Sequence, residues 1–222
     1  MTARTLAIAL GIMVAAGSEA SAQARPRSFE LSVGAIWTSG SSFPRDEATE
    51  VRNQTGGGTF PLFVASSEIG AGPGAEARLA FYLTPRVAIE AGGLFAFQQV
   101  STRLTSDAEN IPDATAVEDL SEYVIDGAVA YHFRPLGRIV PFIRGGVGYL
   151  RQLHEGQTLA ETGTAYHAGG GVSYWLSSGG RGFFKGWGLR GDARVVIRDG
   201  GFSFDDENRT GVVITGALVM AF

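Results

Sequence analysis

The strongest constraint on this chain is an alternation, with a period of two, between apolar residues and smaller or polar ones. The C-terminal segment shows it most clearly, because Val212, Ile214, Leu218, Met220 and Phe222 share one parity and smaller residues fill the other. Successive side chains of a β-strand point to opposite faces, so the pattern predicts a strand with one apolar face. No helical periodicity follows residue 22. We therefore predict an all-β chain.

The same alternation marks eight segments of about ten residues each. They are residues 29–38, 75–83, 87–97, 122–133, 141–150, 165–176, 187–198 and 211–222. Short turns are expected at 84–86 and 134–138, a looser link at 177–186, and long connections at 39–72, 98–121, 151–163 and 199–209. An even strand number, with short and long connections at opposite ends, predicts an antiparallel up-and-down transmembrane β-barrel. Both termini then lie at the short-turn end, with short periplasmic turns and long extracellular loops.

Charge is distributed unequally between the two predicted ends. The short turns carry Arg86, Arg134, Arg138, Arg181 and Lys185 and no acidic residue. The long connections carry 15 of the 22 acidic residues: Asp46, Glu47, Glu50, Glu68, Asp107, Glu109, Asp113, Glu118, Asp119, Glu155, Glu161, Asp199, Asp205, Asp206 and Glu207. A soluble sandwich has no reason to polarise its ends in this way, so the charge favours a membrane barrel.

The first 22 residues are typical of a targeting segment. Arg4 precedes an apolar run from Leu6 to Gly17, and the small residues Ala20 to Ala22 suit signal-peptidase cleavage. The apolar run is too short to span a bilayer as a helix. An uncleaved N-terminal helix is the alternative. We expect a signal peptide at residues 1–22 and an exported barrel domain at residues 23–222.

Alternation alone does not decide whether the apolar face meets lipid or a core. The more charged parity also carries many Gly and Ala residues, which suits a narrow lumen better than a solvated face. Aromatic residues lie near strand ends on the apolar parity, as in an interfacial girdle. They are Phe29, Trp37, Phe81, Phe97, Tyr123, Tyr131, Phe133, Tyr149, Tyr166, Trp187 and Phe222. We predict a membrane barrel; a soluble, lipocalin-like periplasmic binder is the alternative.

Composition and motifs argue against catalysis. The chain has no cysteine, which excludes disulfides, thiolate metal sites and a cysteine nucleophile, and its net charge of −4 argues against nucleic-acid binding. The Gly-rich runs at 56–58 and 169–171 lack a phosphate-loop context, and the acidic run at 205–207 lacks calcium-loop spacing. The histidines are His132, His154 and His167. A Ser-His-Asp triad from distant strands stays open, but we expect no enzyme activity, cofactor or metal site.

Three strands carry a resemblance to a known family. They are the final strand ending in Phe222, the Gly-rich strand 141–149 and the strand 187–194. The whole mature chain resembles the small eight-stranded outer-membrane β-barrels of the outer membrane protein A and X type, which occur in Gram-negative bacteria. The resemblance implies that Phe222 is the signal read by the barrel-assembly machinery. It also implies surroundings of outer-membrane lipid and lipopolysaccharide. Because the sequence ends with the barrel, we expect no C-terminal peptidoglycan-binding domain.

One parity of the predicted barrel places charged residues inside. They are Glu76, Arg78, Glu90, Glu122, Asp126, Arg144, Arg190, Asp192, Arg194 and Arg198, and their signs nearly balance. An eight-stranded barrel is just wide enough for side chains to fill, so these charges must pair or find water. We predict an ion-paired lumen and a non-enzymatic structural or surface-interaction role. The alternative is a narrow channel or carrier for small apolar molecules, resembling outer membrane protein W.

Overall fold

The computed structural model describes residues 28–43, 46–51, 59–105, 112–154, 160–178, 183–201 and 208–222. The expected signal peptide at residues 1–22 lies outside these ranges. In the described parts, no helix is long and apolar enough to cross a membrane. The regular structure there consists of strands, as the period-two alternation predicts.

Eleven strands follow one another along the chain. They are β1 (Phe29–Thr38), β2 (Ser41–Ser42), β3 (Asp46–Val51), β4 (Thr59–Ile69), β5 (Gly72–Tyr82), β6 (Val87–Thr105), β7 (Ala114–His132), β8 (Ile139–His154), β9 (Ala160–Ser178), β10 (Gly186–Gly200) and β11 (Arg209–Ala221).

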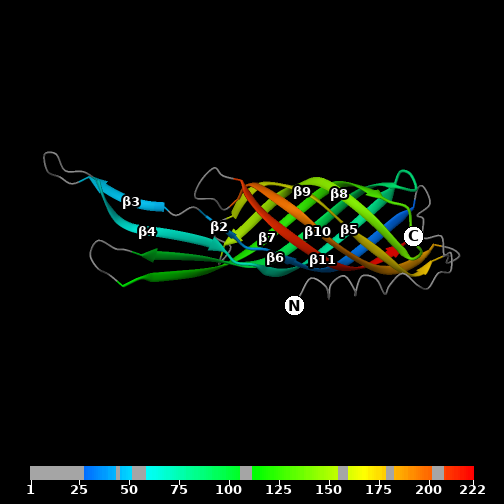
Figure 1. Cartoon of the computed structure of the whole chain (residues 1–222), viewed down its shortest axis with the longest axis horizontal. Helices are drawn as coiled ribbons and strands as arrows, with labels where there is room; N and C mark the ends of the chain where they lie inside the picture. Colours follow the sequence, from blue (N-terminus) through cyan, green and yellow to red (C-terminus); the bar gives the residue numbers. More distant parts are fainter. Residues whose placement is uncertain are drawn as a thin grey trace, which may run out of the picture.

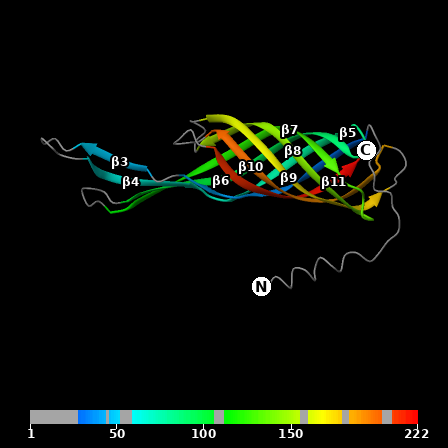
Figure 2. The ribbon, with the colours of Figure 1, turned by 45° about the horizontal axis from the view of Figure 1, so that its top comes forward.

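Eight of these strands close into a barrel (Figures 1 and 2). β1 pairs with β5, each strand from β5 to β11 pairs with the next, and β11 pairs back with β1. Each of these pairings is antiparallel, so the connectivity is up-and-down. The predicted eight-stranded antiparallel barrel is confirmed.

The two ends of the barrel differ as expected. The connections after β5 and β7 are short, and Gly137 has a positive φ of 65° in the second of them. The first and last barrel strands meet at this same end, where the amide of Phe222 donates to the carbonyl of Phe29 at 2.8 Å. Both ends of the barrel sequence therefore lie on the short-turn side.

Three of the expected long loops contain strands instead. In the loop expected at 151–163, residues 151–153 of β8 pair with residues 160–162 of β9. Within residues 39–72, β3 pairs with β4, and β2 also pairs with β4. Within residues 98–121, β6 and β7 continue their pairing out to Leu104 and Ala114. β6 pairs with β5 up to Ala96, and with β4 from Val100 onward. The result is a sheet of β3, β4 and the outer parts of β6 and β7 that projects beyond the barrel mouth (Figure 1).

The barrel exterior is apolar between two rows of aromatic side chains. Ile125 and Val129 are 71% and 57% exposed on this surface. Exposed aromatic residues ring the long-connection end (Trp37, Phe97, Tyr123, Tyr149 and Tyr166) and the short-turn end (Phe29, Tyr131, Phe133, Tyr174 and Trp187). At a rise of about 3.3 Å per residue and a tilt of about 40°, the outward run from Val87 to Phe97 covers about 25 Å, the height of a barrel's apolar band. A soluble lipocalin-like barrel would place its apolar parity inside, which is the reverse of this arrangement.

Candidate functional site

The barrel interior holds the charged parity. All ten charged residues expected in the lumen are buried, each at most 7% exposed: Glu76, Arg78, Glu90, Glu122, Asp126, Arg144, Arg190, Asp192, Arg194 and Arg198. They come from β5, β6, β7, β8 and β10, so they converge on the barrel axis from strands around the ring. The lumen is the candidate functional site.

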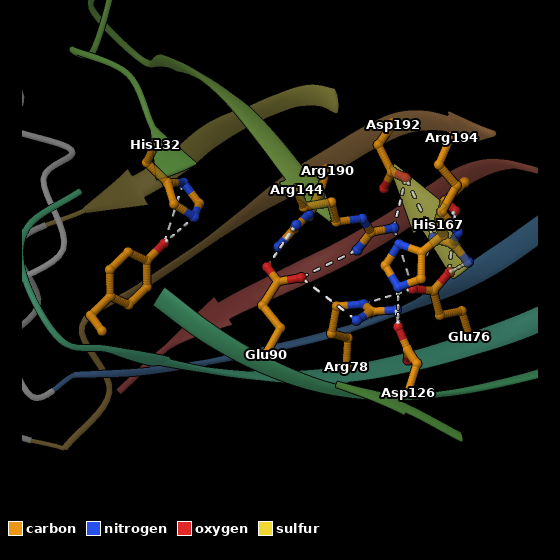
Figure 3. A network of polar contacts seen from close by, with 12 residues as sticks. Glu76, Arg78, Glu90, Asp126, His132, Arg144, His167, Arg190, Asp192 and Arg194 are labelled. Carbon is orange, nitrogen blue, oxygen red and sulfur yellow. Dashed lines mark hydrogen bonds and ion pairs between the residues drawn. The ribbon is translucent and has the colours of Figure 1, made fainter. Parts of the chain in front are cut away.

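Arg78 lies at the centre of the network (Figure 3). Its Nε donates to Glu76 at 2.8 Å, and its Nη2 contacts Asp126 at 2.9 Å. Its Nη1 lies 3.7 Å from Glu90. One guanidinium from β5 thus links carboxylates of β5, β6 and β7. The planar fork of arginine suits such multiple contacts better than the point charge of lysine.

Arg144, which enters the lumen from β8, forms a second centre. Its Nη2 lies 2.7 Å from Asp192 and 3.5 Å from Glu76, and its Nη1 lies 3.4 Å from Glu90. Glu90 also accepts from Arg190 at 2.9 Å. Arg144 therefore connects β8 to β10 and, across the lumen, to β5 and β6.

Arg194 and Arg198 complete the set along β10. Arg194 binds Glu76 through two nitrogens, at 2.6 and 3.2 Å. Arg198 binds both carboxylate oxygens of Glu122, with distances from 2.7 to 3.1 Å. Since Glu122 lies toward the barrel mouth, the Arg198 pair forms a separate outer group rather than part of the central network.

The lumen also contains polar residues besides the ten charged ones that the sequence predicts there. His167 contacts Asp126 at 2.6 Å, and the phenolic oxygen of Tyr82 lies 3.2 Å from His132. Glu30 and Arg209 are also buried, at 3% and 7% exposure. For Glu30 the parity of β1 was a usable signal, whereas Arg209 lies in a segment assigned to a loop. With these two, six acidic residues (Glu30, Glu76, Glu90, Glu122, Asp126, Asp192) face six arginines (Arg78, Arg144, Arg190, Arg194, Arg198, Arg209).

The lumen is not polar along its whole length. Between the central network and the Arg198 group lies an apolar layer of Ile36, Ala96, Val124, Leu150, Ala165, Val196 and Val213. The inward residues of β7 show the layering directly, because Val124 lies between Glu122 and Asp126. The expectation of a polar lumen is therefore incomplete: an apolar layer separates two charged ones.

Gly92 makes space for the central network. A Cβ at this position would lie 2.6 Å from Oδ1 of Asp126 and 2.7 Å from Cζ of Arg78. Any side chain here would therefore overlap the Arg78–Asp126 pair. The neighbouring Gly93 faces the other way, and a Cβ there would meet nothing within 4 Å.

The chemistry available to this arrangement is charge compensation. Each buried carboxylate of the network has at least one guanidinium within 3.1 Å, and isolated charges there would cost several kcal/mol. Across the part of the chain that the structure describes, no group of three or more His, Asp or Glu side chains could hold a metal ion.

Phe222 lies in an aromatic cluster at the short-turn end. Its ring centroid lies 5.0 Å from that of Phe183 and 6.0 Å from that of Phe184. Its carbonyl accepts from Nζ of Lys185 at 2.6 Å and from the amide of Phe29 at 3.3 Å. These contacts fix the end of β11 to the preceding turn and to β1.

No protein-family model matches the chain, and no curated protein matches its sequence. Solved structures resemble it at low identity. The outer membrane protein OprG from Pseudomonas aeruginosa is 12% identical, with a TM-score of 0.49, covering 90% of this chain and 98% of its own. Ail of Yersinia pestis, in complex with the heparin analogue sucrose octasulfate, is 11% identical, with a TM-score of 0.44, covering 89% and 99%.

The outer membrane protein AlkL, solved in lipid bilayers, is 14% identical to the chain, with a TM-score of 0.39, covering 93% of this chain and 96% of its own. These likenesses concern the fold alone. The ring of strands, the buried charges and the exposed apolar band of the chain itself define its architecture. Eight antiparallel strands, charged inside and apolar outside, give this chain the fold of the small outer-membrane β-barrels.

Proposed function

We propose that the protein is a non-enzymatic, integral outer-membrane β-barrel with a lumen sealed by ion pairs and a structural or surface-interaction role. The observation that carries this proposal is the network around Arg78 and Arg144, which joins β5, β6, β7, β8 and β10 across the barrel. A lumen filled in this way braces the wall and obstructs a wide aqueous path. The apolar exterior supplies the surface that lipid would cover.

The projecting sheet supports the surface-interaction role. It extends β6 and β7 beyond the aromatic row at Phe97 and Tyr123, where most of their outward residues become polar, with the exposed Val117 as an exception. Arg103 and Asp113 form an ion pair there at 2.9 Å with exposed side chains, and Gln99 donates to Asp119 at 3.0 Å. This sheet would stand clear of the membrane on the long-connection side.

The rival role, a narrow channel or carrier for small apolar molecules, requires a continuous apolar path. The lumen does contain an apolar layer around Val124 and Leu150. Buried charges bound it on both sides, with Glu122 and Arg198 toward the mouth and Asp126 and Arg194 toward the short turns. The order of these layers favours a sealed barrel over a carrier.

Cell fractionation tests the membrane placement. We expect the protein in the outer-membrane fraction, and we expect unboiled samples to migrate differently from boiled ones, because a closed barrel resists detergent until it is heated. The exposed apolar band of Ile125, Val129 and their neighbours would be removed from water by the lipid of a membrane. Recovery of folded protein in the soluble periplasmic fraction would contradict the proposal.

Phe222 provides a prediction about assembly. We propose that the barrel-assembly machinery recognises it, so that its deletion lowers the amount of protein in the membrane far more than it lowers the stability of barrels that have folded. The control is Phe184→Ala, which removes a ring from the same cluster and leaves the last residue in place. Immunoblots of membrane fractions measure the first effect, and heat-dependent mobility the second. Membrane levels equal to those of the wild type would refute the role of Phe222.

A further inference from the structure

A groove of about 370 Å³ lies on the outer wall of the barrel, over β1, β5, β6 and β7. Strand register explains it. One row of outward residues reads Val33, Ala77, Gly93 and Ile125 across the four strands. Two large residues therefore flank two small ones. The surface between Val33 and Ile125 is recessed, because the side chain of Ala77 is a methyl group and Gly93 has no side chain.

Aromatic rings border the groove on its long-connection side. In the next row outward, Phe95 pairs with Tyr123 across the strands, and their ring centroids lie 4.6 Å apart. Phe97 packs edge-on against Phe95 at 4.3 Å. These rings project further from the barrel wall than Ala77 and Gly93 do. The broad wall of a second barrel would therefore contact the rings before it reached Gly93. A single hydrocarbon chain is narrow enough to lie beside the rings, against Ala77 and Gly93.

A cation lies next to this border. Arg151 is the cross-strand partner of Tyr123 on β8, and it is exposed. No hydrogen bond or ion pair to Arg151 is found within the described ranges, whereas Arg103, further out on β6, is held by Asp113. Arg151 lies just beyond the apolar band, at the level where lipid headgroups begin. Guanidinium groups bind phosphate with two parallel hydrogen bonds, so this level and this charge suit a phosphorylated headgroup.

We propose that the groove and Arg151 form a binding site for one lipopolysaccharide molecule, with an acyl chain of its lipid A against Ala77 and Gly93 and a lipid A phosphate on Arg151. The proposal rests on the outer-membrane placement proposed above, because the long-connection end then faces the outer leaflet. Apolar contact in the groove supplies binding energy, and the guanidinium selects for phosphate.

The test uses the detergent-solubilised full chain and purified lipid A, with retained lipid counted by native mass spectrometry. Gly93→Leu fills the groove without touching the lumen, since a Cβ at Gly93 meets nothing within 4 Å. We expect it to weaken lipid A binding roughly tenfold, the effect of losing contact with about two methylene groups. The matched control is Gly127→Leu, which also points outward into open space but is not part of the groove.

Arg151→Gln tests the headgroup. It should weaken the binding of phosphorylated lipid A and leave the binding of dephosphorylated lipid A unchanged. Phosphatidylglycerol should bind more weakly than lipid A to the wild type, because its headgroup carries one phosphodiester charge whereas lipid A carries two phosphate groups. Equal retention of lipid A by the wild type and Gly93→Leu would overturn the proposal. Equal losses from Gly93→Leu and Gly127→Leu, or equal retention of phosphatidylglycerol, would also overturn it.

The outcome separates this site from the membrane placement. Each variant is first checked for outer-membrane recovery and heat-dependent mobility. If recovery and mobility are normal but neither Gly93→Leu nor Arg151→Gln changes the retention of lipid A, the proposed lipid site is wrong and the membrane placement is unaffected. If the wild-type protein does not fractionate with the outer membrane, the membrane placement itself is wrong.

Discussion

Arg144→Ala is expected to lower the free energy of unfolding by about 3 to 5 kcal/mol, the effect of removing one partner from a buried ion pair. The side chain of Arg144 is 1% exposed and lies within 4 Å of Asp192, Glu90 and Glu76. Glu90 and Glu76 keep other arginines, but the one arginine that still contacts Asp192 among the described residues is then Arg194, at 3.5 Å. Urea unfolding of the refolded barrel, followed by tryptophan fluorescence, measures the change.

Two further variants make this result specific. Arg151→Ala removes an exposed arginine from the same strand, and it should change the free energy of unfolding by less than about 1 kcal/mol. The double variant Arg144→Ala/Asp192→Ala removes both partners of the 2.7 Å pair, and it should be more stable than Arg144→Ala alone. An Arg144→Ala barrel as stable as Arg151→Ala would show that the lumenal ion pairs do not brace the wall.

Gly92→Val is expected to lower the free energy of unfolding by about 1 to 3 kcal/mol, as overpacking of a filled interior does. Its side chain would occupy the space held by the Arg78–Asp126 pair, whose members are 2% and 4% exposed. The guanidinium and the carboxylate would have to separate, which leaves buried charges without their best partners. The same urea unfolding experiment applies.

The neighbouring glycine is the matched control for that substitution. Gly93→Val adds the same side chain one residue further along β6, on the opposite face of the wall, where no atom lies within 4 Å. It should leave the free energy of unfolding close to that of the wild type. Equal losses from Gly92→Val and Gly93→Val would mean that the strand itself, rather than the lumenal network, responds to the added bulk.

The barrel was predictable because one rule governs most of the chain. An eight-stranded wall between lipid and a narrow lumen requires apolar side chains on one parity and small or charged ones on the other. The alternation therefore located all eight barrel strands. Parity also placed Glu76, Asp126 and Arg194 on the inward face.

The projecting sheet was missed because that rule does not hold there. β4 and the outer parts of β6 and β7 leave the barrel wall, so neither face meets lipid or a filled lumen. The outward residues of β6 become Gln99, Ser101 and Arg103, and the segment resembles a polar loop. The strands are held by backbone pairing with neighbours that no local pattern reveals.

The ion pairs could not be assigned from the sequence either. Arg190 pairs with Glu90 across 100 residues, and Arg194 pairs with Glu76 across 118. Such pairs depend on the stagger between strands around the ring, which is a property of the closed barrel. His167 illustrates the limit, because parity assigned it to the face of Arg194 and Asp192 without indicating its contact with Asp126.

Conductance across a planar lipid bilayer tests the central claim of a sealed lumen most directly. The arginines of the central network and the layer around Val124 and Leu150 fill the axis, so the wild-type protein should insert without a large, stable, porin-like conductance. Arg144→Ala should raise the frequency of small openings, because it removes a group that joins four strands. Large and stable conductance from the wild-type protein would contradict the sealed lumen and favour a channel.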